Sequence, residues 1–151
     1  MPDFLVALTK ACEALPADMA LVVRPHPSCR VGQTSALHLA LTNPRIRVIE
    51  GSTSAEMLKN CEAVVTVNSS VGLEAFAYDK PVITLGESFY RGPGLTAQAE
   101  SAAELKGLFS QIDSLDFDAQ LRRRFLTWLR EAGFQRWPRH ARDPAAKALA
   151  E

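Results

Sequence analysis

Cysteine and histidine are scarce in this sequence, and neither is arranged to bind a metal. The three cysteines, Cys12, Cys29 and Cys61, are widely spaced, and no Cys-x-x-Cys pair occurs. An odd number of scattered cysteines is typical of a reducing compartment and gives neither a disulfide framework nor a zinc site. The three histidines are equally scattered. We therefore expect a cytoplasmic protein that holds no metal.

The sequence also lacks a long apolar run and a surplus of either charge. No run approaches the roughly 18 consecutive apolar residues that a membrane-spanning helix needs. Lys plus Arg number 17, as do Asp plus Glu. This balance argues against nucleic acid as the main partner, because binding to a phosphate backbone usually needs a basic surplus. Residues 3–15 have a helical apolar period and lack the basic region and cleavage site of a signal peptide.

The glycine-rich motifs of common nucleotide and hydrolase sites are missing. There is no Gly-x-Gly-x-x-Gly, no Gly-x-x-x-x-Gly-Lys-[Ser/Thr] and no Gly-x-Ser-x-Gly, so dinucleotide, P-loop and α/β-hydrolase sites lack their key residues. What is present is a regular alternation of segments. Short apolar runs near 19–23, 46–49, 63–67 and 81–85 are separated by helical segments. This alternation predicts an α/β fold in which helices flank a Rossmann-like parallel sheet.

The length and the later helices suggest one domain. A chain of 151 residues can bury a proper core. We expect residues 1–137 to form a single domain and residues 138–151 to be a weakly ordered tail, because the tail has no strong apolar period. The helix expected at 117–132 carries Arg122–Arg124 and Arg130, which we assign mainly to a solvated face.

Ser/Thr-x-x-Glu patterns mark two further helix starts. Thr53 and Glu56 have the spacing of a capping box, and so do Ser101 and Glu104 at the start of a helix expected at 101–112.

Residues 63–86, AVVTVNSSVGLEAFAYDKPVITLG, are the stretch around which the rest is organised. They predict a buried strand, a sharp turn, a short helix near 71–77 and a second buried strand. Asn68, Ser69 and Ser70 fall where the first strand ends and the helix begins, an edge that faces the ligand crevice in parallel α/β sheets. Backbone N–H groups at a helix start favour an anion, and one serine can cap the helix while its neighbour offers a hydroxyl to a phosphate oxygen.

Two residues of the short helix extend this hypothesis. Gly72 would let the backbone come close to a bound group. Glu74, about one turn into the helix, could reach sugar or ribose hydroxyls. A capped helix start without a ligand would show the same pattern, so this stretch alone leaves both interpretations open.

Two loops add candidates at the same sheet edge. The first strand runs into Arg24-Pro25-His26-Pro27, where two prolines stop the strand and fix the direction of His26. After the strand at 81–85, Phe89 and Tyr90 could stack on a base or sugar, and Arg91 could meet a phosphate. The alternative interpretations are a polar loop residue for His26 and an ordinary surface turn for the aromatic loop.

The motifs RPHP, NSSVGLEA and LGESFYRGPGLT, in this order and spacing, resemble those of bacterial capsule polysaccharide synthesis proteins of the KpsC/KpsS (LipA/LipB) type. Members of that family are retaining β-Kdo transferases of GT-B-like architecture that use CMP-Kdo. The His-Pro and Ser-Ser motifs are also similar to those of bacterial sialyl- and polysialyltransferases, which use CMP-sialic acid. The resemblance spans about residues 21–96.

The resemblance implies roles for individual residues. His26 would be catalytic and would contact the CMP phosphate or the charge that develops on it as it leaves. The serine pair would hold the same phosphate, and the acidic residue after it would bind ribose hydroxyls. The residues expected to bind the nucleotide and its phosphate are His26, Asn68, Ser69, Ser70, Gly72 and Glu74. Those expected to line the nucleotide or sugar pocket are Arg24, Phe89, Tyr90, Gly94, Leu95 and Thr96.

The same resemblance covers only the C-terminal, donor-binding half of a GT-B enzyme. We therefore expect a CMP-sugar donor to bind here, without cofactor or metal, and little transfer by the chain alone. A glycan or glycolipid acceptor would bind to the other half, and a peripheral association with the inner membrane stays open. The alternatives are a UDP-sugar transferase, a UDP-GlcNAc 2-epimerase-like domain, and a non-catalytic domain that docks a partner or membrane surface through its arginine-rich last helix.

Overall fold

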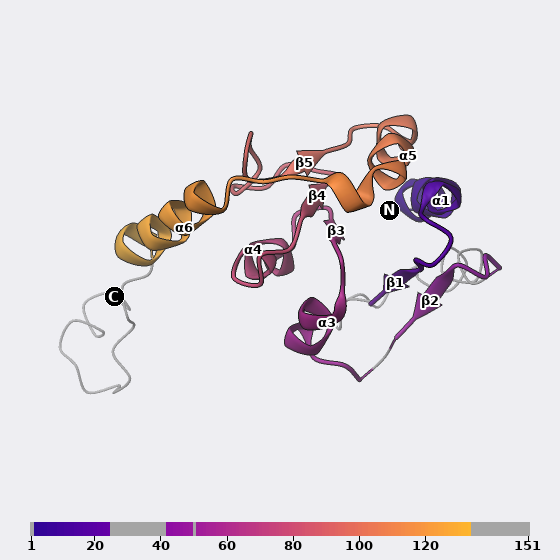
Figure 1. Ribbon diagram of the computed structural model, residues 1–151, viewed down its shortest axis with the longest axis horizontal. Coiled ribbons are helices and arrows are strands. Elements are labelled where there is room, and N and C mark those ends of the chain that lie inside the picture. Colours follow the sequence, from indigo (N-terminus) through magenta and orange to yellow (C-terminus); the bar gives the residue numbers. More distant parts are fainter. Residues whose placement is uncertain (1, 25–41, 50, 134–151) are drawn as a thin grey trace, which may run out of the picture.

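Strands and helices alternate along most of the chain, as the apolar pattern predicts (Figure 1). The computed structural model describes residues 2–24, 42–49 and 51–133. The elements in chain order are α1 (Pro2–Ala11), η1 (Cys12–Ala14), β1 (Leu21–Val23), β2 (Ile46–Val48), α3 (Ser54–Asn60), β3 (Val64–Thr66), α4 (Ser70–Phe76), β4 (Val82–Thr84), β5 (Ala97–Gln98), α5 (Ala102–Ser110), η2 (Ile112–Ser114), α6 (Ala119–Trp128) and the π-helical turn η3 (Leu129–Gly133).

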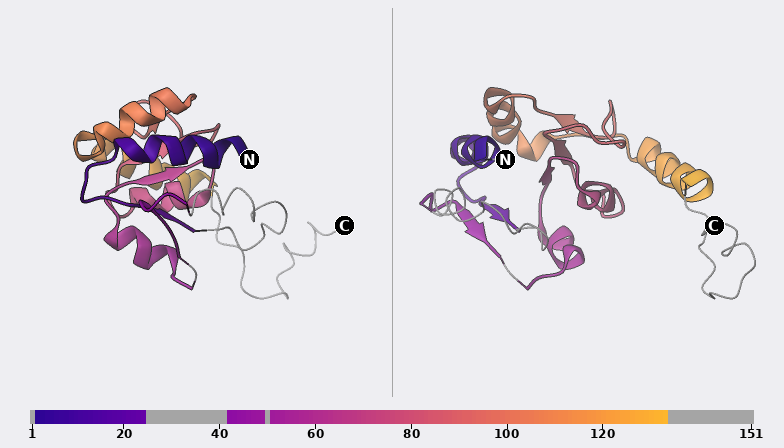
Figure 2. Two further views of the ribbon diagram at one scale, coloured as in Figure 1. Left: turned by 90° about the vertical axis from the view of Figure 1, so that its right-hand side faces the viewer. Right: turned by 180° about the vertical axis from the view of Figure 1, so that it is seen from behind.

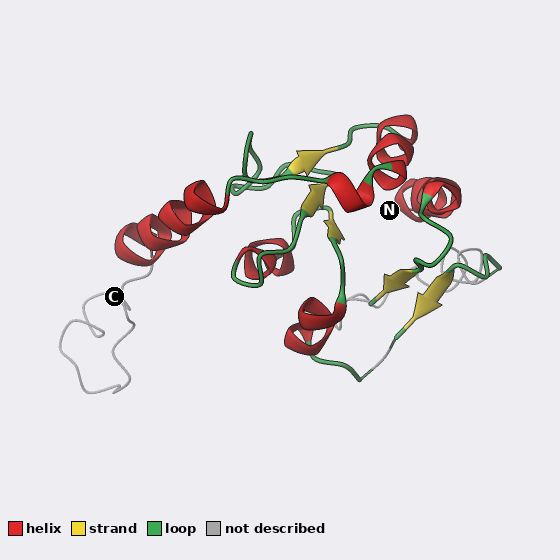
Figure 3. Cartoon of the chain, viewed as in Figure 1, coloured by secondary structure: helices red, strands yellow, loops and turns green. Residues whose placement is uncertain are grey.

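All strand pairs in the described residues are parallel, and they form two sheets. β1 pairs with β2, while β3, β4 and β5 form a three-stranded sheet with β4 at its centre. The predicted α/β class with parallel strands flanked by helices is confirmed (Figure 3). The expectation of a single sheet is not met within these residues. β5 was not predicted, because its two residues follow a glycine-rich loop and are too few to show an alternating pattern.

Apolar clusters cover both faces of the three-stranded sheet. Val82 of β4 packs with Leu58 of α3 and Phe76 of α4, whereas the next residue, Ile83, packs into a cluster with Leu8 of α1 and other residues of α1 and α5. Successive side chains of a strand point to opposite faces, so β4 is buried on both sides. The helices α1 and α5 lie side by side on one face, and α6 leads away from the opposite end of the sheet (Figures 1 and 2).

Side-chain caps fix the starts of the helices beside the sheet. At α3, Thr53 Oγ1 accepts a hydrogen bond from Glu56 N at 3.2 Å, and the Glu56 carboxylate accepts one from Thr53 N at 2.9 Å. At α5, Ser101 Oγ accepts from Glu104 N at 3.2 Å. Both predicted N-caps are confirmed. The capping box is complete only at Thr53, because the carboxylate of Glu104 accepts from Glu100 N instead.

A buried arginine attaches α6 to the sheet. Arg122 is 1% exposed, which corrects the assignment of this residue to a solvated face. Its guanidinium carbon lies 4.2 Å from the ring centre of Phe76 and 3.7 Å from that of Phe117. The same group donates hydrogen bonds to the carbonyl oxygens of Lys80 and Leu95. This burial could not be predicted from three consecutive arginines, because it depends on which face of the helix packs against the aromatic rings and carbonyl groups.

Among the residues that the structure describes, no helix has the length and apolar character needed to cross a membrane.

Candidate functional site

The turn after β3 has the strand–turn–helix form that the sequence predicts, and Ser69 caps its helix. Ser69 Oγ accepts a hydrogen bond from Val71 N at 3.3 Å, and Ser69 O accepts one from Gly72 N at 3.1 Å. The amide of Ser69 donates to Thr66 Oγ1 at 3.1 Å. Three N–H groups at this turn therefore already donate hydrogen bonds within the protein. Fewer are left to bind an anion than the sequence predicts.

The groups that remain at the turn belong mainly to its two other polar residues. Asn68 and Ser70 are exposed, and within the described part of the chain no hydrogen bond involves either side chain. Since Ser69 is the cap, Ser70 is the neighbour whose hydroxyl can meet a ligand. The contact of Asn68, Ser69 and Ser70 with a phosphate stays a prediction.

Tyr90 is buried against this turn. Its side chain is fully buried, and its hydroxyl donates a hydrogen bond to Ser69 O at 2.5 Å. A Cβ atom built on Gly72 would lie 2.5 Å from that hydroxyl oxygen and 3.0 Å from Thr66 Cγ2. Gly72 therefore makes room for the tyrosine. Contact of either residue with a nucleotide stays a prediction.

The two residues that flank Tyr90 in the aromatic loop differ in their surroundings, since Phe89 is exposed whereas Arg91 forms ion pairs. Phe89 is 67% exposed and contacts the Tyr90 ring edge-on, with 5.3 Å between the ring centres. Arg91 lies between Glu87 and Glu100 and forms an ion pair of 2.5 Å with each. The bond to Glu100 is the main reason that the pKa of Arg91 rises. A phosphate at Arg91 would have to compete with two carboxylates.

Phe89 also belongs to a row of aromatic side chains that continues onto α6. Its ring lies 6.4 Å from that of Phe125, which lies 6.0 Å from that of Trp128, with tilts of 31° and 32°. Trp128 is 59% exposed. Phe89 and Trp128 are thus two exposed large apolar side chains of the described residues at this end of the molecule.

The residues at 92–96 connect the loop to α6. Gly94 has a φ of +74°, and its carbonyl oxygen accepts a hydrogen bond from Asp118 N at 2.8 Å. Leu95 O accepts from the buried guanidinium of Arg122, and Thr96 Oγ1 accepts from Gly92 N at 3.3 Å. These contacts give Gly94, Leu95 and Thr96 structural roles, and their place in a nucleotide pocket stays untested.

The remaining predicted site residues that the structure describes are Arg24 and Glu74. Arg24 follows β1 and donates to Ser54 Oγ, at the start of α3, at 2.8 Å. Glu74 is exposed on α4. His26 lies outside the described residues. The structure thus brings Ser69, Gly72 and Tyr90 together, and no hydrogen bond joins Arg24 or Glu74 to them.

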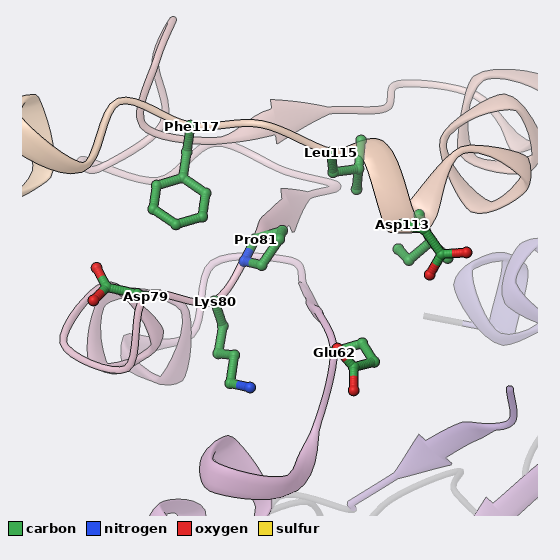
Figure 4. A pocket seen from close by; sticks show the side chains of 8 residues that line it. Glu62, Asp79, Lys80, Pro81, Asp113, Leu115 and Phe117 are labelled. Atoms are coloured by element: carbon green, nitrogen blue, oxygen red, sulfur yellow. The ribbon is translucent and has the colours of Figure 1, made fainter.

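A cavity of about 300 Å³ lies at the opposite, amino-terminal end of β3 and β4 (Figure 4). It was not predicted, because its charged residues come from separate segments that show no common motif. No group of three or more His, Cys, Asp or Glu in the described ranges is placed to hold a metal ion. The residues that line the cavity are Glu62, Asp79, Lys80, Pro81, Ile112, Asp113, Leu115 and Phe117.

Two residues of the Ser69 cluster were missed by the sequence analysis. Thr66 is the last residue of β3 and is almost fully buried, and Ser88 Oγ is buried within the aromatic loop. Thr66 had no distinguishing signal, since a β-branched residue is ordinary in a strand. Ser88 stands two residues before Tyr90 in the LGESFY motif, which is the only hint that the sequence offered.

Parallel strands with helices on both faces, and a capped serine turn after one strand, define an α/β protein of the Rossmann-like kind. The chain belongs to the family described as "Capsule polysaccharide biosynthesis protein", whose sequence model matches residues 2–126. This confirms the family resemblance predicted from the three motifs.

Two relatives are similar over part of their length. Protein FixF of Sinorhizobium fredii is 33% identical over 129 residues, which cover 85% of this chain and 31% of FixF. The "Capsule polysaccharide export protein KpsS" of Escherichia coli is 37% identical over 54 residues, which cover 36% of this chain and 14% of KpsS. The chain therefore spans less than a third of either relative. No solved structure matches.

Proposed function

We propose that this chain is the donor-binding part of a glycosyltransferase of capsule polysaccharide biosynthesis, and that the donor is a CMP-sugar of the CMP-Kdo type. The observation that carries the proposal is the Ser69–Ser70 turn after β3, within a chain whose family is that of capsule polysaccharide biosynthesis. The RPHP and SFYRGPGLT motifs, which flank this turn in the sequence as in CMP-Kdo-dependent transferases, support the choice of donor.

The chemistry requires stabilisation of a leaving phosphate. When the sugar is transferred, CMP leaves as a phosphate monoester, and hydroxyl or imidazole donors near its oxygens lower the barrier by stabilising that charge. Ser70 and Asn68 are exposed at the turn, so they are the described side chains best placed to donate to a phosphate. His26 would supply the imidazole. The acceptor would bind to a part of the enzyme that this chain does not contain, so we propose that the chain binds donor but transfers little.

Two other functions compete with this proposal. The first is a UDP-sugar transferase or a UDP-GlcNAc 2-epimerase-like domain, which would share the fold but select uridine nucleotides. The second is a non-catalytic interaction domain, which the exposed rings of Phe89 and Trp128 favour, since large exposed aromatic side chains often mark binding surfaces.

A calorimetric titration with CMP, UMP, UDP and cytidine separates these functions. We expect CMP to bind more tightly than the other three and to raise the melting temperature most. Tighter binding of UDP would favour the uridine alternative. If no nucleotide binds and the protein instead shows salt-dependent binding to lipid or protein, the interaction domain would be favoured. Kdo transfer by this chain alone would contradict the expected need for a second half.

The residue His26 offers a second test. His26→Ala should remove most CMP binding and leave the melting temperature unchanged, because the residue is expected on a loop between two prolines. Unfolding of the variant, together with no CMP binding by the original protein, would assign His26 a structural role instead.

A further inference from the structure

A cluster of buried hydroxyl groups lies under the Ser69 turn. The Tyr90 hydroxyl donates to Ser69 O at 2.5 Å, and Thr66 Oγ1 accepts from Ser69 N at 3.1 Å. Tyr90 is fully buried and Thr66 is 6% exposed. Ser88 Oγ is also buried and makes no hydrogen bond of ordinary geometry within the described residues. Burial raises the pKa of Tyr90, and the nearby side-chain hydroxyls of Ser88 and Thr66 act against that rise. The N–H group of Ser69 is therefore hydrogen-bonded to the side chain of Thr66, and its carbonyl oxygen to the side chain of Tyr90.

The hydroxyl of Tyr90 does more than fill space. A phenylalanine ring would pack in the same volume, whereas a buried phenol must find a hydrogen-bond partner to offset its loss of water. The partner is the carbonyl oxygen of the residue that caps α4, which comes from a different segment, 21 positions earlier in the chain. The contact links the loop after β4 to the turn after β3, the two segments that the sequence motifs single out.

The tyrosine ring has little room to move. Its hydroxyl lies so close to Gly72 that a Cβ atom there would be 2.5 Å away. On its other sides it meets the rings of Phe76 and Phe89, both edge-on, at 5.8 Å and 5.3 Å between ring centres. Since closely packed side chains transmit displacements rather than absorb them, the position of the ring fixes the position of Ser69 O.

We propose that Tyr90 is a positioning residue, which sets the conformation of the Asn68–Ser70 turn through the hydrogen bond from its hydroxyl to Ser69 O. The inference rests on the proposed function, because the turn is the part of the site that would bind the donor phosphate. In this role Tyr90 needs no contact of its own with the nucleotide. It acts through Ser69, with Thr66 as its counterpart on the amide side of the same residue.

The first test compares Tyr90→Phe with Tyr78→Phe. Tyr78 is the other tyrosine of the sequence, and none of the described hydrogen bonds involves its hydroxyl, so Tyr78→Phe is a matched control. We expect Tyr90→Phe to weaken CMP binding about fivefold to tenfold, the usual effect of one lost hydrogen bond. Cytidine, which lacks the phosphate, should bind as before. CMP affinity equal to that of the control, or an equal loss for both ligands, would overturn the proposal.

The second test needs no ligand and separates this inference from the proposed function. Amide hydrogen exchange of Ser69, Val71 and Gly72 should be about tenfold faster in Tyr90→Phe, because the turn opens more readily, while exchange in α5 stays unchanged. If the original protein binds no CMP, the proposed function fails, and this measurement still decides whether Tyr90 positions the turn. Unchanged exchange at all three amides would overturn the inference.

Thr66 provides a second pair of variants, which serves also if Tyr90→Phe fails to fold. Thr66→Val keeps the shape of the side chain but removes the acceptor of Ser69 N, whereas Thr66→Ser keeps the hydroxyl. We expect faster amide exchange at the turn and weaker CMP binding in Thr66→Val, with both restored in Thr66→Ser. Equal behaviour of the two variants would show that only packing matters at this position.

Discussion

The guanidinium of Arg122 and the carbonyl oxygen of Leu95 are joined by two hydrogen bonds, from Nε at 3.0 Å and from Nη2 at 2.6 Å. Nη1 of the same group donates to Lys80 O at 2.7 Å. Burial lowers the pKa of Arg122 to about 10, so the group is still charged at neutral pH. One side chain of α6 is thereby bonded both to the loop that carries several predicted pocket residues and to Lys80, two residues before β4.

The first prediction concerns this buried cation. Arg122→Met should lower the free energy of unfolding by about 3 kcal/mol, because two partly buried carbonyl groups lose the donors that the buried guanidinium supplies. The neighbouring Arg123 is exposed, so Arg123→Met should change stability by no more than about 0.5 kcal/mol. Urea denaturation of both variants measures the difference. Equal midpoints would mean that Arg122 does not anchor α6.

The second prediction concerns the space between α4 and Tyr90. Gly72→Ala should destabilise the protein by about 1–3 kcal/mol, since the new methyl group would clash with the closely packed side chain of Tyr90. Gly107 in α5 is the matched control, because a Cβ atom there meets nothing within 4 Å. Gly107→Ala should stabilise the helix by about 0.5–1 kcal/mol. Thermal unfolding of both variants tests the contrast, and a neutral Gly72→Ala would refute it.

The third prediction separates the two serines of the turn. Ser69→Ala should cost about 1 kcal/mol of stability through loss of the helix cap. Ser70→Ala should be nearly neutral, within about 0.5 kcal/mol, because the side chain is exposed. Under the proposed function, the double variant should weaken binding of CMP more than of cytidine. Calorimetry with both ligands measures this, and equal losses would contradict a role at the phosphate.

The fourth prediction concerns pH. The hydrogen bond from Thr53 N, followed by that from the Thr53 hydroxyl, lowers the pKa of Glu56 below its ordinary value of 4.5. A carboxyl whose pKa is lowered in the folded state stabilises the protein above its unfolded pKa, and this contribution is lost as the pH falls through the lowered value. Glu56→Gln can keep the capping box without this titration.

Urea unfolding of the original protein and of Glu56→Gln, at about pH 7 and about pH 3, measures this contribution. We expect the free energy of unfolding of the original protein to fall more between these two pH values than that of Glu56→Gln does, because only the original protein loses the charged carboxylate. A difference that does not change with pH would show that the Glu56 carboxylate does not contribute to stability.

Local patterns predicted most of the secondary structure. The strands at 21–23, 46–48, 64–66 and 82–84 all fall within apolar runs that were assigned as strands. A serine cap at the start of α4 followed from the turn residues of the motif, and the structure shows that Ser69 rather than Ser70 is the cap. Such features are encoded by neighbours in sequence, because strand burial, helix period and capping each depend on a few consecutive residues.

The sequence by itself determined the α/β class, the family and the place of the serine turn, since each depends on short motifs and local periodicity. Only the tertiary structure decided that Tyr90 is buried under Ser69, that Gly72 makes room for it, and that Arg122 lies between two aromatic rings. Apart from the contact of Arg122 with the nearby Phe117, these contacts join residues between 18 and 46 positions apart. Whether a tyrosine or an arginine is buried depends on what the fold places opposite it, and no local pattern contains that information.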